Sequence, residues 1–496
     1  APPQEWQQQV HYTIEARLDE ETDVLTGRMR IRYRNESPDT LTAFYLHQYL
    51  NAFRPNSAWA RRDLEHGIRT FQQLGEDDRA FERLTRASVD GEALLWTHPY
   101  APDSTIVRLD LPTPLPPGGT VTVDLDWDAR LSTVPRRQGR RGRHYDFAQW
   151  YPRVVVYDRE GWRDQRLYRQ GEFYGEFATY DVRLEVAEDQ VLGATGVPLS
   201  GDPGWVGARA GGAALGSLQS DWYGSERDPP CAGEGRDRVC GVPGRTPVLG
   251  PSLGLLAGDP ADGTKQVRWY AEDVHHFAWS ADPAFVYEGG ERDGTAIHVL
   301  YLPEDSESWG DGIAVERTRV ALDWLEHVFG PYAYPQVTNL RRLDSGGTEF
   351  PMLVMNASAS QSLILHEVGH IWAHGILGNN EWYEGWLDEG MSSFQTAWFF
   401  EKEGRGREQW LQSELRVLDL ELQGKSEPVT FVAQDYSEYA IYSRMIYTKG
   451  SLILRMLRDM GGEDKMLEIL RTYYLSLIHI SEPTRLRRNS RMPSSA

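Results

Sequence analysis

Apolar and polar side chains alternate along several segments between residues 8 and 200. In 121–127 the apolar residues occupy every second position, from Val121 to Trp127, and polar residues fill the positions between them. Residues 180–186 and 29–33 repeat this alternation. A period of two with one polar face predicts half-buried antiparallel strands. Because turns rich in Pro and Gly separate these runs, we expect a β-sandwich-like domain.

A stretch dense in Gly and Pro interrupts this pattern between residues 198 and 264. It lacks clear periodicity, so we interpret it as a long insertion. It holds both cysteines of the chain, Cys231 and Cys240, which could close one small loop in an oxidising compartment or remain two free thiols. Alternation resumes over 265–273, which predicts a strand that returns to the sheet.

The pattern changes to helical spacing after about residue 290. We expect one short apolar strand over 297–302 and helices over 311–329, 360–377, 383–403 and 444–460. Strands followed by helices favour two domains, of which the second mixes α and β elements.

We therefore place an N-terminal all-β domain in residues 1–290 and the α+β domain in residues 291–475. Residues 476–496 show neither helical nor alternating period, and they carry four Arg and one Glu. They resemble a translated sequencing adapter, and we expect them to have no function. A basic tail is the alternative interpretation.

Composition excludes several classes of protein. The chain has 496 residues, of which 40% are hydrophobic and 25% charged, as is typical of globular proteins. Its formal net charge of −21 argues against nucleic acid or anionic lipid as a partner, since both are polyanions. No apolar run reaches the ~18 residues of a transmembrane segment. The chain starts at Ala1, which a removed signal peptide would explain, so we expect a bacterial-type periplasmic or secreted protein, with the cytoplasm as the alternative.

The candidate chemistry lies in the predicted helix 360–377, which contains the motif HEVGH at 366–370. At about 100° per residue, His366 and His370 lie one turn apart on the same face, so both imidazoles can meet one tetrahedral zinc ion. Glu367 lies about 100° further round the helix, where it can accept a proton from a water at the metal.

Two histidines leave the zinc ion short of a third protein ligand. Astacin-type enzymes supply a histidine six residues after the second motif histidine, but Ile376 stands at that position. His374 is one alternative, although HExxH sites rarely use its spacing. The other is Glu389, which follows His370 after eighteen intervening residues, enough for a turn and an antiparallel helix. Two histidines and one glutamate with an open fourth position form a catalytic zinc arrangement.

The chain resembles the aminopeptidase N and leukotriene hydrolase family of gluzincin metallopeptidases, peptidase family M1. The resemblance lies in the order of its motifs: HExxH, then eighteen residues, then the Glu of WLDEG (386–390). Residues 447–450 (YTKG) match the family's Tyr-x-Lys-Gly element, and 346–350 (GGTEF) stand where the family carries its Gly-Ala-Met-Glu-Asn exopeptidase element. Residues 171–182 fit its N-terminal β-saddle domain. The resemblance implies a β-saddle or sandwich domain followed by a thermolysin-like zinc-peptidase domain, with the family's C-terminal helical domain absent.

The resemblance also assigns roles to single residues. Tyr447 would stabilise the oxyanion that forms at the substrate carbonyl. Glu349, with Gly346 of the same element, would bind the free α-amine of a peptide, and Gln149 would assist. The other residues of the exopeptidase element are replaced, which leaves the preferred N-terminal residue open. A surface carboxylate and a strand-end amide are the alternatives for Glu349 and Gln149.

These residues predict an enzyme with one Zn²⁺, a zinc-dependent aminopeptidase that removes N-terminal residues from peptides with a free N-terminus. Glu367 would act as general base and then as general acid. A gluzincin endopeptidase, an epoxide hydrolase-like relative and a non-catalytic peptide-binding relative are the alternatives. A cluster of arginines is interpreted as a solvated loop or, alternatively, as a site for substrate carboxylates: Arg136, Arg137, Arg140, Arg141 and Arg143.

Overall fold

The computed structural model describes residues 6–171, 173–205, 249–256, 258, 260 and 263–481, with side chains up to residue 475. The chain forms two compact units. Unit 1 comprises the described residues of Ala1–Tyr168, Gly175–Gly312 and Tyr334–Ala357. Unit 2 comprises those of Arg169–Tyr174, Ile313–Ala333 and Ser358–Ala496. The domain boundaries expected at 290 and 475 stay predictions.

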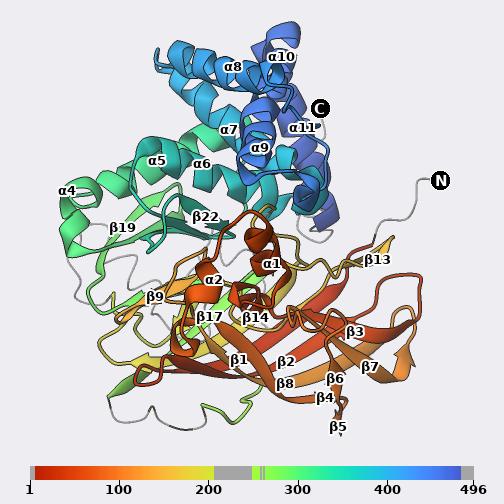
Figure 1. Ribbon diagram of the computed structural model, residues 1–496. Coiled ribbons are helices and arrows are strands. Elements are labelled where there is room, and N and C mark those ends of the chain that lie inside the picture. Colours follow the sequence, from red (N-terminus) through yellow and green to blue (C-terminus); the bar gives the residue numbers. More distant parts are fainter. Residues whose placement is uncertain are drawn as a thin grey trace, which may run out of the picture. The chain divides into compact units, whose positions relative to one another are not determined.

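An eight-stranded sheet is the largest sheet of unit 1 (Figure 1). Its strands lie in the order β16(Val197–Ser200), β17(Thr264–Val274), β14(Ala178–Ala187), β1(Gln9–Asp19), β2(Val24–Arg34), β8(Thr120–Arg130), β4(Phe81–Val89) and β5(Glu92–Ala93). The four strands predicted by alternation fall within β2, β8, β14 and β17 and are confirmed. The expectation of antiparallel pairing is wrong at one place, because β1 and β14 are parallel.

The two long strands β8 and β14 bury their faces differently. β8 alternates as expected: the apolar residues at every second position from Val121 to Trp127 are buried, and the polar residues between them are half-buried. In β14 the polar residues Asp181 and Glu185 are also buried, which corrects the predicted polar face. The reason is that a segment crosses this face: Gly250 donates its N–H to Asp181, and Arg268 pairs with the same carboxylate. Buried carboxylates on this strand are thus neutralised by hydrogen bonds and ion pairs.

Smaller sheets complete unit 1. One four-stranded sheet has the order β15(Val191–Ala194), β18(Trp279–Asp282), β10(His144–Phe147) and β9(Gly139–Arg141). A second four-stranded sheet has the order β11(Arg153–Val154), β3(Leu41–His47), β7(Ile106–Leu115) and β6(Trp96–Thr97). A hairpin joins β12(Tyr157–Asp158) and β13(Gly161–Trp162). The remaining sheet has five strands in the order β19(Val286–Arg292), β20(Thr295–Tyr301), β21(Gln336–Arg341), β23(Leu353–Asn356), β22(Gly347–Phe350). β20 confirms the apolar strand expected over 297–302.

Short helices connect the strands of unit 1. They are η1(Tyr49–Phe53), α1(Ala58–Glu65), α2(Thr70–Gln73), η2(Glu76–Asp78), η4(Pro303–Asp305) and α4(Ser306–Trp309). Ser57 caps α1 by accepting a hydrogen bond from Ala60 N.

Unit 2 is helical in the described residues. Its helices are α5(Ile313–Val328), α6(Gln361–His370), η5(Ile371–Ile376), α7(Glu381–Lys402), α8(Gly406–Leu422), η6(Ala433–Asp435), α9(Tyr439–Ser443), η7(Arg444–Lys449), α10(Gly450–Gly461) and α11(Glu463–Ser481). These confirm the four predicted helices. The periodicity did not reveal that η5 and η7 are π-helical, a geometry that is frequent at functional sites.

Some expectations concern the C-terminal segment and the insertion, which the structure describes only in part. α11 continues to Ser481, so the lack of helical structure expected from residue 476 is wrong over 476–481. Residues 482–496, Cys231, Cys240 and most of the insertion expected over 198–264 lie outside the described residues. Among the described residues, no helix combines the length and the apolar character that crossing a membrane requires.

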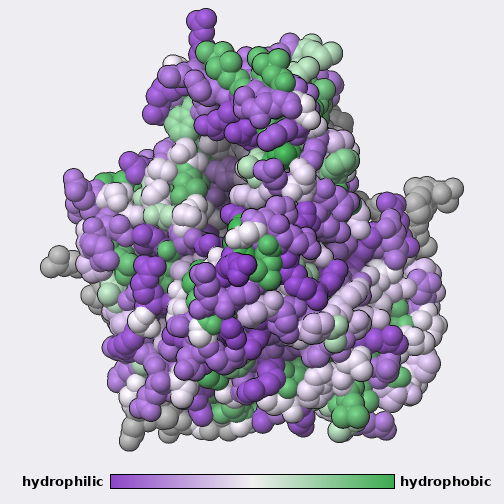
Figure 2. All heavy atoms as spheres, viewed as in Figure 1, coloured by the Kyte–Doolittle hydropathy of each residue, from purple (hydrophilic) through white to green (hydrophobic). Residues whose placement is uncertain are grey.

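Apolar side chains are exposed on α8 and α10, and Figure 2 shows hydrophobic patches among hydrophilic ones over these helices. On α8 the exposed leucines recur every three or four residues: Leu411, Leu415, Leu418 and Leu422. Met456, Leu457 and Met460 are exposed on α10. α8 therefore has one stripe of leucines toward solvent in addition to the face that holds the buried Trp410 and Leu420.

Candidate metal centre

The helix α6 carries the two candidate histidine ligands and begins at a defined cap. The Ser360 hydroxyl accepts a hydrogen bond from Leu363 N, as an N-cap residue should. One helical turn separates His366 from His370, and their ring centroids are 4.6 Å apart with the ring planes at 89°. The prediction that both rings lie on one face of a helix is therefore confirmed.

Helix α7 brings Glu389 to these histidines. The Asn380 side chain caps α7 by accepting from Trp382 N at 3.1 Å. Gly369 allows α6 and α7 to pack closely, because a Cβ at this position would lie 2.6 Å from Nε2 of Gln395 on α7. That Gln395 Nε2 donates to Leu365 O at 2.7 Å, which fixes the register of the two helices.

Three donor atoms converge in unit 2. Glu389 Oε2 lies 3.1 Å from His366 Nε2 and 3.2 Å from His370 Nε2. Two ligands bound to one zinc ion at ~2.0–2.1 Å and a tetrahedral angle lie roughly 3.3–3.4 Å apart, so these separations fit a shared ion. The side chains of His370 and Glu389 are 1% and 4% exposed, whereas His366 is 17% exposed. The donor set is thus buried on one side and accessible on the other.

The electrostatics of the three residues favour a cation at this point. Burial opposes the protonation of His370, but the carboxylates of Asp388 and Glu389 hold its pKa well above the ordinary value. Burial also opposes the ionisation of Glu389, yet His370 and His366 keep its pKa below the ordinary range. Each carboxylate therefore stabilises positive charge at the histidines, as a bound divalent ion would require. The chemistry and the spacing of the donors both fit zinc.

Asp388 is a further candidate site residue, which the sequence analysis left without a role. Its Oδ1 lies 2.7 Å from His370 Nδ1, and Ser392 Oγ lies 3.2 Å from the same nitrogen. A partner at Nδ1 fixes the ring orientation and leaves Nε2 to bind a metal. The signal in the sequence was its position: a carboxylate directly before a ligand on the same helix.

His374, the alternative third ligand, lies elsewhere. Its Nδ1 is 3.1 Å from Glu381 Oε1, and both side chains are fully buried. The group of possible ligands in unit 2 contains His366, His370 and Glu389. The structure therefore pairs His374 with Glu381, and the geometry favours Glu389 as the third ligand.

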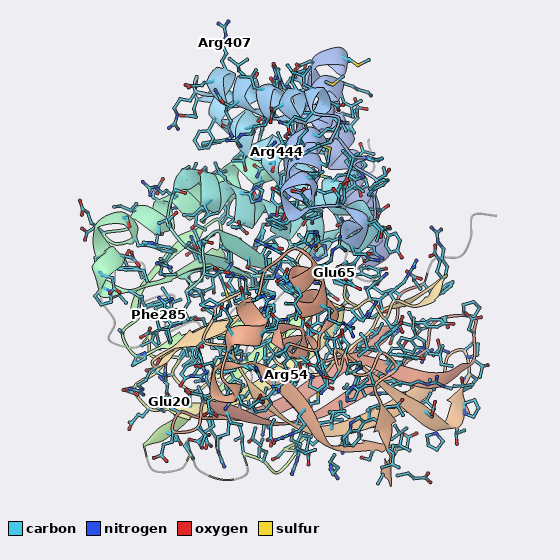
Figure 3. The ribbon with its side chains drawn as sticks, viewed as in Figure 1. Glu20, Arg54, Glu65, Phe285, Arg407 and Arg444 are labelled. Atoms are coloured by element: carbon cyan, nitrogen blue, oxygen red, sulfur yellow. The ribbon has the colours of Figure 1, made fainter. Side chains whose placement is uncertain are left out.

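Tyr447 lies beside the donor set. Its ring stacks on His366 with a centroid distance of 6.0 Å and an interplanar angle of 15°. The π-helix η7 that carries Tyr447 approaches α7 where two glycines face each other, since a Cβ on Gly390 would lie 3.2 Å from Gly450. Ion pairs join η7 to α8: Arg444, which Figure 3 labels, pairs with Asp419 at 3.4 Å, and Lys449 pairs with Glu421 at 2.8 Å. The position of Tyr447 is thus fixed from two sides.

Glu367, the candidate general base, is 4% exposed on α6 between the two histidines. The structure brings together five of the eight predicted site residues in unit 2: His366, Glu367, His370, Glu389 and Tyr447. The other three, Glu349, Gly346 and Gln149, belong to unit 1.

The three site residues of unit 1 lie on a hairpin and a loop. Glu349 is 5% exposed on β22, and Gly346 precedes that strand with a φ of +72°, which a glycine adopts without strain. Gln149 has a φ of +56° and is 7% exposed, and its Nε2 has no hydrogen-bond partner in the described part of the chain. A buried amide that is not satisfied is unusual and suits a binding position.

The fold and the donor set define a class of protein: a two-unit chain with the ligand arrangement of gluzincin metallopeptidases. Residues 352–480 match the model of the Peptidase family M1 domain. The chain therefore carries a peptidase family M1 domain, and the resemblance seen in the sequence is confirmed.

Curated relatives agree over limited segments. The chain is 31% identical over 118 residues to the alanine/arginine aminopeptidase of Saccharomyces cerevisiae, which is 22% of this chain and 14% of that protein. It is 25% identical over 209 residues to aminopeptidase M1-B of Oryza sativa subsp. japonica, 38% of this chain and 24% of that protein. Leukotriene A-4 hydrolase of Xenopus laevis is 29% identical over 179 residues, 32% of this chain and 29% of that protein. The matched segments thus span less than a third of these relatives.

Solved structures agree over nearly the whole chain. The M1 zinc metallopeptidase of Deinococcus radiodurans aligns with a TM-score of 0.59 at 15% identity, over 95% of this chain and 86% of that one. This likeness confirms the predicted fold class, a β-rich part followed by an M1 peptidase-like part.

Proposed function

We propose that this protein is a zinc-dependent aminopeptidase, which hydrolyses the first peptide bond of peptides with a free N-terminus. The observation that carries the proposal is the convergence of His366 Nε2, His370 Nε2 and Glu389 Oε2 within unit 2. The names of the aminopeptidases and zinc metallopeptidases to which the chain is similar support it.

His366, His370 and Glu389 would hold the zinc ion, with Asp388 orienting His370. When bound, zinc polarises a substrate carbonyl and lowers the pKa of a water molecule. Glu367 would take the proton of the attacking water at its carboxylate and deliver it to the leaving amine. Its location on the ligand helix, mostly buried, keeps this carboxylate near the reacting atoms and largely out of bulk water.

Tyr447 would donate its hydroxyl hydrogen to the oxyanion that develops at the scissile carbonyl. A donor that is already positioned stabilises this charge most in the transition state, where the charge is largest. Glu349 would accept hydrogen bonds from the substrate's α-ammonium group, a charge-assisted contact, and Gln149 would contribute its buried amide. Recognition of the free N-terminus would make the enzyme an exopeptidase.

The experiment is mass spectrometry of a peptide pool, free and N-acetylated, incubated with the zinc-loaded protein with and without a chelator. We expect chelator-sensitive loss of single N-terminal residues from the free peptides alone. Cleavage of the acetylated pool would make the protein an endopeptidase and contradict the role of Glu349. Hydrolysis of an epoxide substrate without any peptide cleavage would favour the epoxide hydrolase alternative.

A further inference from the structure

An arginine stands against the carboxylate proposed to bind the substrate amine. In unit 1, Nη1 of Arg137 lies 4.0 Å from Oε1 of Glu349, and the two side chains are 22% and 4% exposed. This separation is too long for a direct hydrogen bond, so the guanidinium acts on Glu349 through its charge. The expectation of a solvated loop is therefore wrong at Arg137, and it is also wrong at Arg140, which is 12% exposed and pairs with Asp23 at 2.6 Å.

The backbone at Arg137 is strained. Eight described residues other than glycine have a positive φ, and five of them are aspartates, which tolerate this conformation. The other three are Arg137 (+62°), Gln149 (+56°) and Met352 (+63°). Met352 lies in the turn between β22 and β23, next to the strand of Glu349. Strain that the surrounding structure maintains is common at binding sites, and here it occurs at Arg137, at Gln149 and beside Glu349.

The loop holds Arg137 in place through its neighbours. Arg136 N donates to Gln138 O at 2.8 Å, which closes a tight turn around Arg137. The buried Gln138 accepts a hydrogen bond from Ser132 N through its side chain. Gly139 leaves no room for a side chain, because a Cβ would lie 2.8 Å from Pro135. The guanidinium of Arg137 is therefore positioned by a packed loop.

Two further arginines of unit 1 pair with a second carboxylate, Asp344. Arg136 lies 4.0 Å from Asp344, and Arg342 lies 3.6 Å from the same carboxylate. Arg136 and Arg342 thus lie at Asp344, whereas Arg137 is the arginine that pairs with Glu349. An α-ammonium group bound at Glu349 would have Arg137 as a neighbour of like charge, which opposes binding unless the ligand also brings a negative group.

We propose that Arg137 makes this carboxylate selective for peptides whose first residue is Asp or Glu. The α-ammonium group binds Glu349, and the side-chain carboxylate of the same residue, a few bonds away, binds Arg137. The Glu349 and Arg137 pair then matches an ammonium and a carboxylate carried by one amino acid. This inference rests on the proposed function and adds its substrate class.

The test compares kcat/KM for peptides that begin with Glu and with Gln, which have the same shape and differ in charge. We expect the parent protein to prefer Glu by at least tenfold, and Arg137→Gln to bring the ratio close to one. Arg137→Lys, which keeps the charge, should retain part of the preference. Arg136→Gln is the matched control, because Arg136 belongs to the same loop and pairs with Asp344 instead.

Either of two results overturns the proposal: a parent protein that prefers Gln, or an Arg137→Gln variant with an unchanged ratio. The preference of the parent protein is measured without any variant, so a variant that fails to fold does not weaken the test. If the parent shows no chelator-sensitive cleavage of any free peptide, the proposed function fails separately. In that case NMR titrations of the parent and of Arg137→Gln with L-glutamate and L-glutamine test the inference. Equal affinities of the parent for the two amino acids would reject it.

Discussion

The Nδ1 atom of His370 lies 2.7 Å from Oδ1 of Asp388, and the opposite ring nitrogen faces Glu389 at 3.2 Å. Two consecutive residues of α7 thus contact the two nitrogens of one imidazole. Because Nδ1 has an acceptor, its N–H is held there and Nε2 keeps its lone pair for a metal. This contact orients the most deeply buried histidine of the donor set.

Replacing Asp388 should weaken zinc binding without removing a ligand. For Asp388→Ala we expect the affinity for zinc to fall by about 10- to 100-fold, because His370 loses the partner that orients its ring. Asp388→Asn keeps an acceptor and should lie between the parent and the Ala variant. A competition titration with a chromophoric chelator measures both, and equal affinities in all three proteins would exclude an orienting role.

Glu367→Gln should retain zinc and lose turnover. The amide preserves the shape of the side chain but cannot accept and return a proton, so we expect kcat to fall by about 100- to 10,000-fold. Mass spectrometry measures the metal content of the variant, and kinetic assays with a peptide measure kcat on the same sample. Glu389→Ala is the contrasting variant, because it should lose zinc and activity together. Equal activity in Glu367→Gln and the parent would refute the mechanism.

Tyr447→Phe isolates the hydroxyl from the ring. The phenyl ring can keep the stacking on His366, so folding and metal content should not change. Loss of the donor to the oxyanion should lower kcat by about 100- to 1,000-fold with a smaller effect on KM. A variant whose KM rises while kcat stays constant would instead place the hydroxyl in ground-state binding.

The β-rich unit should lose stability in mild alkali because of His144. Burial opposes protonation of this ring, but Asp146 and Asp282, at 3.1 and 2.8 Å, raise the pKa of His144 to about 9. A pKa raised in the folded state gives stability that is complete below about pH 6.5 and is lost as the pH rises through about 9. The change in unfolding free energy should be on the order of 3 kcal/mol.

Calorimetric unfolding of the parent and of His144→Gln at pH 6.5, 8 and 9.5 checks this expectation. The decrease with pH should be present in the parent and reduced in the variant. The same slope in both proteins would assign the dependence to other groups.

Local patterns in the sequence were sufficient for several long strands and for the placement of the two motif histidines. Alternation identified β2, β8 and β17. In β2 and β8 one face is buried and the other is half-buried or exposed, whereas β17 also buries Tyr270 and Glu272 of its second face. Helical spacing alone places the two histidines of HEVGH on one face, whereas Glu389 was expected from the eighteen-residue spacing that the chain shares with the M1 family. The burial of Asp181 was not predictable, since it depends on a segment almost seventy positions away that covers β14.

Contacts between distant residues explain the other omissions. Asp388 contacts His370 only because α6 and α7 pack in one register, which Gly369 and Gln395 set. Arg137 reaches Glu349 across more than two hundred positions of sequence, through a loop whose conformation no periodicity encodes. The π-helical turns likewise depend on packing, because propensity does not distinguish them from ordinary helix.

The π-helix η7 makes the length of its segment as important as its composition. An i→i+5 turn holds one residue more than an α-helical turn, so deleting any single residue from 444–449 would allow an ordinary helix to form. Deletion of Thr448 or Lys449 would rotate Tyr447 relative to α10 by about 100° and carry its hydroxyl off the face that meets His366. Across natural variants of this protein, substitutions in 444–449 should therefore be tolerated far more often than insertions or deletions.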